Sequence, residues 1–240
     1  MRLSRLLRTL DEISPFELQE EWDNSGLIVG DPDREISQVY VGLDVDDRVL
    51  DEVEEGSALI VHHPLIFKGL RMLDFRLFPS RLIREAIRKE ISIVAMHTNF
   101  DKSHLNRYVA TQILGYEEIL CEGYLCSFEV NKPFLEFAEE IRQRLGLKVL
   151  KTVETKAYIQ RAALCTGSGA DLMAMVKDDC LLTGDIKYHQ AMEAKLNGLA
   201  MVDIGHFESE RFFGEILQKE LKNYNIHAIM AHSQNPFTYM

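Results

Sequence analysis

The chain has little cysteine, proline or tryptophan: its 240 residues include four cysteines, six prolines and one tryptophan. The cysteines form no Cys-x-x-Cys pair and no dense framework, which argues against a cysteine-rich metal site and against a disulfide scaffold. We therefore expect reduced thiols, as in a cytoplasmic protein, at Cys121, Cys126, Cys165 and Cys180.

Long hydrophobic runs are also absent. The longest ones, such as residues 58–61 and 91–96, are far shorter than the roughly 20 residues that cross a membrane. Residues 1–10 alternate arginine and leucine without a continuous apolar stretch, so we expect no signal peptide there. The sequence thus predicts a cytoplasmic protein with no membrane partner.

Positive charge is scarce relative to negative charge. Lysine and arginine number 27, aspartate and glutamate number 38, and the formal net charge is −11. Because phosphate binding needs a basic surface, this balance argues against a protein whose main task is to bind nucleic acid. The basic residues that do cluster form either a solvated face or a rim for an anionic substrate, and they are Lys68, Arg71, Arg76, Arg81 and Arg84.

What the sequence does contain is a regular alternation of strand-like and helix-like segments. In the first half, strands are predicted at residues 36–45, 58–62 and 91–97, and helices at residues 46–55, 79–90 and 103–114. In the second half, strands are predicted at residues 127–130, 147–153, 157–164, 180–183, 199–204 and 226–231, and helices at residues 133–145, 171–177, 187–196 and 207–221. This rhythm predicts an α/β fold with much parallel pairing. A seam in composition near residues 121–123 divides it into domains 1–123 and 124–240.

Histidines stand at the ends of three predicted strands. His62 and His63 close one strand, His97 closes the next, and His206 follows a third, with Glu210 four residues later. Ligands of open α/β sheets collect beyond the carboxyl ends of strands, so we expect these side chains at one edge. The i, i+4 spacing predicts that His206 and Glu210 share one helix face, the alternative being a capping glutamate beside an unrelated histidine.

These residue types suit a metal site. Adjacent strand residues point to opposite faces, so His62 and His63 reach one site only where the chain turns. Asp101 taken alone is an ordinary loop acid or helix N-cap. Together with His206 and Glu210, they suit two divalent ions of zinc, iron, manganese or nickel, completed by water. Two ions that share a water support metal-assisted hydrolysis.

Several motifs occur in order along nearly the whole chain. They are Glu21-Trp22-Asp23-Asn24-Ser25-Gly26-Leu27, Val41-Gly42-Leu43-Asp44, His62-His63-Pro64, His97-Thr98-Asn99-Phe100-Asp101, Thr183-Gly184-Asp185-Ile186-Lys187-Tyr188-His189, Gly205-His206 through Glu210, and Asn235-Pro236-Phe237. Each motif is weak alone, but the set is highly specific. It resembles the GTP cyclohydrolase 1 type 2 homologue family, also called the NIF-three-like proteins.

The resemblance implies two linked α/β domains of related topology with a dinuclear metal site between them. It also implies a hexameric ring, built as a trimer of dimers. Matched residue by residue, it implies metal ligands at His62, His63, Asp101, His206 and Glu210. Some members carry an additional domain near the middle, for which this chain is too short. The family name implies GTP ring opening, an activity that is not established across the family.

The leading hypothesis is a dinuclear metal hydrolase for a small anionic or nucleotide substrate, in which His97 or His189 moves protons. A structural histidine is the alternative at both positions, and His97 could also donate to Asp101. Instead of an enzyme, the chain could form a ring that stores or delivers metal or docks a partner protein. Nucleic-acid binding is a third hypothesis, which the charge disfavours.

Two further segments leave alternatives open. Residues 165–171 form a turn rich in glycine and serine that could offer backbone N–H groups to phosphate. Because it lacks a Walker lysine, a tight turn is the better interpretation. Trp22, with Asp23 and Asn24, could line a base-stacking pocket, although a lone tryptophan more often belongs to the core.

Overall fold

The computed structural model describes residues 1–240, which fold into two compact units. Unit 1 comprises Met1–Ser103 and Phe213–Gln234, and unit 2 comprises His104–Phe212 and Asn235–Met240. These bounds differ from the division predicted at residue 123, because the chain returns to unit 1 near its C-terminus. There, β11 (Ile229–Met230) pairs in parallel with a strand of the first sheet.

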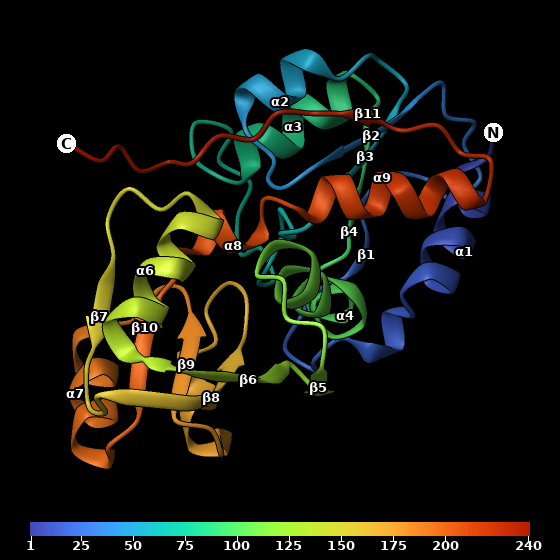
Figure 1. Cartoon of the computed structure of the whole chain (residues 1–240). Helices are drawn as coiled ribbons and strands as arrows, with labels where there is room; N and C mark the ends of the chain where they lie inside the picture. Colours follow the sequence, from blue (N-terminus) through green and yellow to red (C-terminus); the bar gives the residue numbers. More distant parts are fainter. The chain divides into compact units, whose positions relative to one another are not determined.

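Unit 1 is built on a five-stranded sheet of order β1-β4-β3-β2-β11 (Figure 1). Its strands are β1 (Gly26–Val29), β2 (Val39–Gly42), β3 (Ala58–Val61), β4 (Ser92–Ala95) and β11. β2, β3 and β4 are parallel and completely buried, whereas β1 pairs antiparallel with β4 at the edge. Parallel strands that are covered on both faces have continuous hydrophobic sequences, and this is why β2, β3 and β4 were predicted from the sequence.

Helices cover both faces of this sheet. Those of unit 1 are α1 (Leu3–Ile13), the 3₁₀ turn η1 (Phe16–Leu18), α2 (Asp47–Glu52), α3 (Ser80–Arg88), α4 (Thr98–Phe100) and α9 (Phe213–Asn223). Tyr40 of β2 packs with α2 and α3 in one hydrophobic core. Its neighbour Val41 points to the opposite face, where its Cγ1 faces Gly214 of α9.

Unit 2 contains a six-stranded mixed sheet of order β5-β6-β8-β9-β10-β7. Its strands are β5 (Ile119–Glu122), β6 (Leu125–Pro133), β7 (Lys151–Val153), β8 (Tyr158–Leu164), β9 (Cys180–Thr183) and β10 (Ala200–Asp203). β8, β9 and β10 are parallel, and the outer pairs are antiparallel. The sheet packs against helices through a core that includes Leu181, Ala194 and Met201.

The remaining helical segments are short or irregular, apart from two. After α4 the chain continues as the π-helical turn η2 (Asp101–Leu105), α5 (Asn106–Tyr108) and the π-helical turn η3 (Val109–Ile113). Unit 2 further contains α6 (Phe134–Leu145), the 3₁₀ helix η4 (Ala170–Met175), α7 (Tyr188–Asn197) and α8 (His206–Glu210). None of the helices combines the length and the apolar character that crossing a membrane would require.

Three expectations differ from the structure. The helix predicted over residues 207–221 is two helices, α8 and α9, separated by a turn at Arg211 and Phe212. The strands β1 and β5 were not expected, because both are short and only half-buried and so lack a strong periodic signal. His62 and His97 follow strands of the first sheet, but His206 follows β10 of the second, so the expectation of one shared sheet edge is wrong.

The expectation of four reduced thiols is wrong for two of them. Cys121 and Cys126 form a disulfide across the β5–β6 hairpin, where they are directly opposite each other with Cα atoms 4.0 Å apart. Glu122 and Leu125 are the last paired residues before the hairpin loop, and each cysteine is the next residue away from the loop on its strand. Two cysteines at equal distances from a short loop therefore indicate a cross-strand disulfide, a pattern that the Cys-x-x-Cys criterion does not include. The other two cysteines, Cys165 and Cys180, are buried and form no disulfide.

Candidate metal centre

Neighbouring parallel strands of unit 1 end at the same edge and place polar side chains there. Asp44 follows β2, His62 and His63 follow β3, and His97 follows β4. The backbone N–H groups of both His62 and His63 donate to the carbonyl oxygen of Leu43, at 3.1 and 3.2 Å. Regular strand pairing therefore stops here and the chain turns, which is the condition under which adjacent histidines can reach one site.

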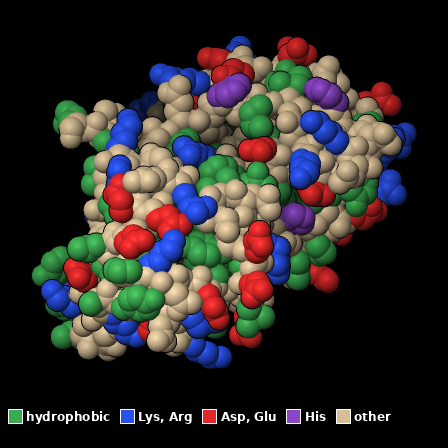
Figure 2. All heavy atoms as spheres, in the orientation of Figure 1, with side chains coloured by type: hydrophobic (Ala, Val, Ile, Leu, Met, Phe, Trp, Pro, Cys, Tyr) green, Lys and Arg blue, Asp and Glu red, His purple; other side chains and the backbone are tan.

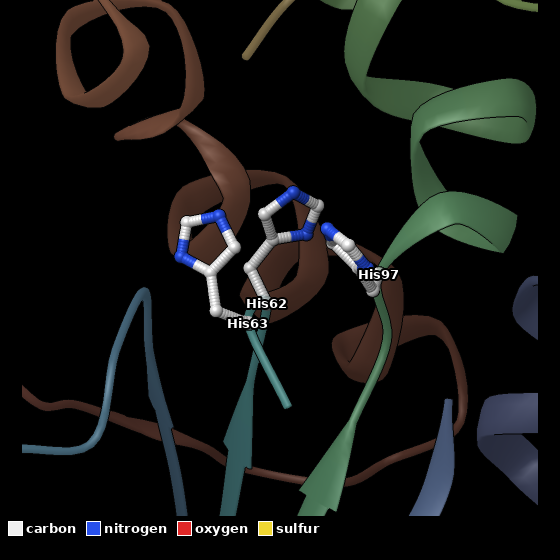
Figure 3. A group of neighbouring side chains, drawn as sticks. All are labelled: His62, His63 and His97. Carbon is white, nitrogen blue, oxygen red and sulfur yellow. The ribbon is translucent and has the colours of Figure 1, made fainter. Parts of the chain in front are cut away.

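The structure brings three imidazoles together beyond this edge (Figure 3). The ring centroid of His62 lies 4.9 Å from that of His63 and 5.2 Å from that of His97, and the last two are 5.5 Å apart. One nitrogen from each ring lies within 4.8 Å of the others, so the group could hold a metal ion. His62 is completely buried, and the other two are partly exposed.

The Nδ1 atom of each imidazole is held by an oxygen. The oxygens are the carbonyl of Met96 for His62 (2.9 Å), a carboxylate oxygen of Asp44 for His63 (2.7 Å) and one of Asp23 for His97 (2.7 Å). Since a carbonyl or an ionised carboxylate only accepts, Nδ1 is the donor in each ring, and in the neutral ring the lone pair is then on Nε2. Metal-binding histidines in proteins are oriented in this way.

Asp23 fixes His97 and the start of α4. Its buried carboxylate also accepts hydrogen bonds from the Thr98 N–H (3.0 Å), the Thr98 hydroxyl and the Asn24 N–H (2.8 Å). Burial by itself would raise the pKa of Asp23, but the hydrogen bond and charge of His97, followed by the other donors, lower that pKa well below its usual value. Asp23 is therefore ionised at neutral pH and holds the imidazole in one orientation.

Asp101 begins the π-helical turn η2 and is largely buried. π-Helical turns occur frequently at functional sites. Its Oδ1 lies 3.4 Å from Nε2 of His62, which is longer than an ordinary hydrogen bond. That distance is about the separation of two tetrahedral ligands that each lie ~2.1 Å from one ion. Because α4 already begins at Thr98, Asp101 is not the N-cap of this helical run.

In unit 2, the structure confirms that His206 and Glu210 share one face of α8. Nε2 of His206 lies 3.0 Å from Oε2 of Glu210, which is buried, and Nδ1 of His206 contacts Asp185 at 2.7 Å. Asp185 has a φ of +55°, a conformation that costs energy for a residue with a side chain. Gly167 approaches so closely that a Cβ there would overlap Oε1 of Glu210.

Several backbone N–H groups of the turn at residues 165–171 already donate hydrogen bonds to side chains of the protein. The backbone N–H groups of residues 166, 167 and 169 donate to side-chain oxygens of Asn106 (2.7 Å), Ser209 (3.0 Å) and Thr183 (2.8 Å). These groups are unavailable to a phosphate, so the interpretation as a tight turn is confirmed. Through Gly167 the turn serves instead to confine the carboxylate of Glu210.

Two other sets of candidate residues are His189 and the basic cluster. His189 is exposed next to Tyr188 on α7, and its role in proton transfer stays a prediction. In the basic cluster, Arg76 binds Asp74 and Arg81 binds Asp47, while Arg84 lies over the ring of Phe75. The exposed pair Lys68 and Arg71 is therefore what remains for an anionic substrate.

Sequence reasoning missed the carboxylates that hold the rings, which are Asp23, Asp44 and Asp185. A signal exists for one of them: β2 and β3 pair with Gly42 opposite Val61, so Asp44 is in register with His63. The position of Asp44 just beyond β2, in register with His63, could therefore have identified it as the partner of that ring. The other two are fixed by loops, whose path the sequence does not predict.

The chain is similar to known proteins over nearly its full length. The sequence model described as Duf34/NIF3 (NGG1p interacting factor 3) matches residues 1–236. A Campylobacter jejuni protein named GTP cyclohydrolase 1 type 2 homolog is 46% identical over 240 residues and covers 100% of both chains. Helicobacter pylori GTP cyclohydrolase 1 type 2 is 38% identical, with 98% of this chain and 97% of that protein covered. The crystal structure of Staphylococcus aureus protein SA1388 is 26% identical, with a TM-score of 0.90 and 100% and 99% of the chains covered.

Proposed function

Because the chain belongs to the Duf34/NIF3 family, we propose that it is a metal-dependent hydrolase for a small anionic, nucleotide-like substrate. The observation that carries this proposal is the group formed by His62, His63 and His97, in which every Nδ1 is held by an oxygen, so that the neutral ring directs the lone pair of Nε2 at a ligand. The names of the relatives make GTP the first substrate to assay.

The proposed ligands hold two divalent ions, of zinc, iron, manganese or nickel. They are His62, His63 and Asp101 of unit 1 and His206 and Glu210 of unit 2. Neutral imidazoles with buried carboxylates fit such ions, and the 3.4 Å between His62 and Asp101 is the spacing of adjacent tetrahedral ligands. His206 and Glu210 lie 3.0 Å apart on one helix face. When bound, the ions would supply Lewis acidity for hydrolysis.

The surrounding residues act on orientation and on protons. Asp44 and Asp185 fix the rings of His63 and His206, which keeps their lone pairs directed at one place. In this proposal His97 takes up and returns a proton at Nε2, and the ionised Asp23 at its Nδ1 stabilises the charged ring.

Elemental analysis of the purified chain tests the metal proposal. We expect two ions per wild-type chain and fewer in Asp101→Ala. His232→Ala is the matched control, because His232 also faces a carboxylate, Glu52, at 3.4 Å but lies outside the histidine group. A wild-type chain that binds no divalent ion, or equal losses in both variants, contradicts the proposed centre.

The hydrolase proposal is tested by turnover. Wild-type protein loaded with each metal is incubated with GTP and the other nucleoside triphosphates, and products are separated chromatographically. We expect metal-dependent hydrolysis that His63→Ala abolishes. If the ions bind but no nucleotide turns over, the chain is not such a hydrolase, and a ring that stores or delivers metal becomes the better hypothesis.

A further inference from the structure

The only tryptophan of the chain lies on the surface beside a second exposed aromatic ring. Trp22 is 58% exposed and Phe67 is 42% exposed, so the interpretation of Trp22 as a core residue is wrong. Their ring centroids are 5.7 Å apart and their planes are inclined by 52°. Rings inclined in this way do not stack on each other, and aromatic surface remains open on both.

This aromatic pair borders the candidate metal centre. The ring of His97 is inclined steeply to both, at 76° to Trp22 and 75° to Phe67, with its centroid 6.3 Å from that of Trp22 and 6.0 Å from that of Phe67. A flat molecule that stacks on one of the two rings and contacts the other would therefore lie beside His97.

Side-chain hydrogen bonds anchor the two segments that carry these rings. Next to Trp22, the side chain of Asp23 is anchored to His97 and to α4, as described above. The side-chain amide of Asn24 donates to the carbonyl oxygen of Ile66, at 2.5 Å, and so ties this segment to the one that carries Phe67. Fixed, exposed aromatic surface is typical of a binding site, because a ligand that covers it gains contact without ordering a loop.

We infer that Trp22 and Phe67 are the stacking site for a nucleobase, a placement that rests on the proposed function for its link to a substrate. Every base has a π face that stacks on aromatic side chains. Lys68 directly follows Phe67 and is exposed without an ion-pair partner, which supplies positive charge for the phosphate of the same ligand.

Because Trp22 is the only tryptophan, its fluorescence reports on this site alone. Metal-free wild-type protein is titrated with guanosine monophosphate, uridine monophosphate and ribose 5-phosphate, with excitation selective for indole. We expect saturable quenching by the two nucleotides and none by the sugar phosphate. Since the protein is metal-free and no turnover is measured, this result is independent of whether the chain hydrolyses anything.

Variants then assign the binding to the rings, with affinity for guanosine monophosphate measured calorimetrically. Trp22→Leu and Phe67→Leu should each weaken binding at least about fivefold, and Trp22→Phe should restore most of it. Tyr158→Leu, which removes an exposed aromatic ring of unit 2, is the control and should leave the affinity unchanged.

Three outcomes overturn the inference. They are quenching by neither nucleotide, equal quenching by ribose 5-phosphate, and unchanged affinity in both leucine variants. If Trp22→Leu instead changes the sedimentation coefficient and leaves nucleotide affinity intact, the rings are covered by a second copy of the chain. A chain that binds no metal but shows base-dependent quenching would refute the proposed function and leave the stacking site standing.

Discussion

At the scale of single residues, the candidate centre depends on side chains that do not bind metal in the proposal. Asp44 contacts His63 at 2.7 Å and is in turn positioned by Ser233, whose hydroxyl oxygen accepts the backbone N–H groups of Leu43 (3.1 Å) and Asp44 (2.9 Å). The orientation of the His63 ring thus depends on Ser233, which lies 233 − 63 = 170 positions later in the sequence.

Removal of this support gives a first prediction. Asp44→Ala should lower the affinity for divalent metal about 10- to 100-fold, because the ring of His63 loses its orienting acceptor. Competition with a chromogenic chelator measures the affinity. Asp47→Ala, which removes only a surface partner of Arg81, is the control. Equal affinities in the two variants would show that Asp44 does not position a ligand.

A second prediction concerns the close approach of Gly167 to Glu210. Gly167 and Gly146 have nearly the same φ, +62° and +65°, but a Cβ at Gly146 meets nothing within 4 Å. Both alanine variants should lose some stability from the left-handed backbone. Only Gly167→Ala should also lose metal, since the new methyl group displaces the carboxylate. Chemical denaturation and metal stoichiometry, measured in parallel, separate the two effects, and metal loss in both variants would refute the explanation.

At this scale the sequence predicted which residue types gather but not what holds them. The strand-end positions of His62, His63 and His97 follow from hydrophobic runs that stop there, and the structure places their rings together. The partners of those rings come from loops and from the carbonyl of Met96, and periodicity carries no information about them.

At the scale of elements, the β5–β6 hairpin joins Cys121 and Cys126 across a short loop. A disulfide that closes so short a loop, with a sequence separation of five, limits the unfolded chain only slightly. We therefore predict that the double variant Cys121→Ser/Cys126→Ser lowers the free energy of unfolding by at most about 2 kcal/mol. Urea denaturation measures this, and thiol titration of the denatured, unreduced wild type should find two free thiols. Four free thiols would show that the bond is absent.

The elements themselves were predicted where burial is complete. β2, β3, β4 and β9 are buried at every position, and all four lie within predicted strands. β1 and β5 were missed since half-buried strands of four residues have too few side chains to show a period. The break between α8 and α9 was also missed, because the apolar pattern continues through Phe212 and Phe213.

At the scale of the whole molecule, negative side chains outnumber positive ones, 38 to 27. On the face shown in Figure 2, lysine and arginine side chains alternate with aspartate and glutamate, without a broad area of one sign. Together with the net charge of −11, this distribution disfavours nucleic acid as a partner.

The hexameric ring implied by the family resemblance is a prediction at this scale. On α7, Tyr188, Met192 and Leu196 form an apolar stripe with i, i+4 spacing, and they are 78%, 47% and 80% exposed. Exposed apolar stripes of this kind are commonly buried between subunits. Sedimentation should therefore give six times the chain mass, and Leu196→Glu should shift it to smaller species. A wild-type monomer would contradict the hexameric ring. A hexamer in Leu196→Glu would contradict the role of α7 in its assembly.

The return of the chain to unit 1 has a consequence for the order of folding. β11 completes the first sheet, and Ser233 secures the loop that carries Asp44, yet most of unit 2 lies between His97 and these residues in the sequence. During synthesis His62 and His63 therefore emerge well before the strand and the hydroxyl that fix the loop beside them. We expect the first sheet to close only after the intervening residues of unit 2 have been made.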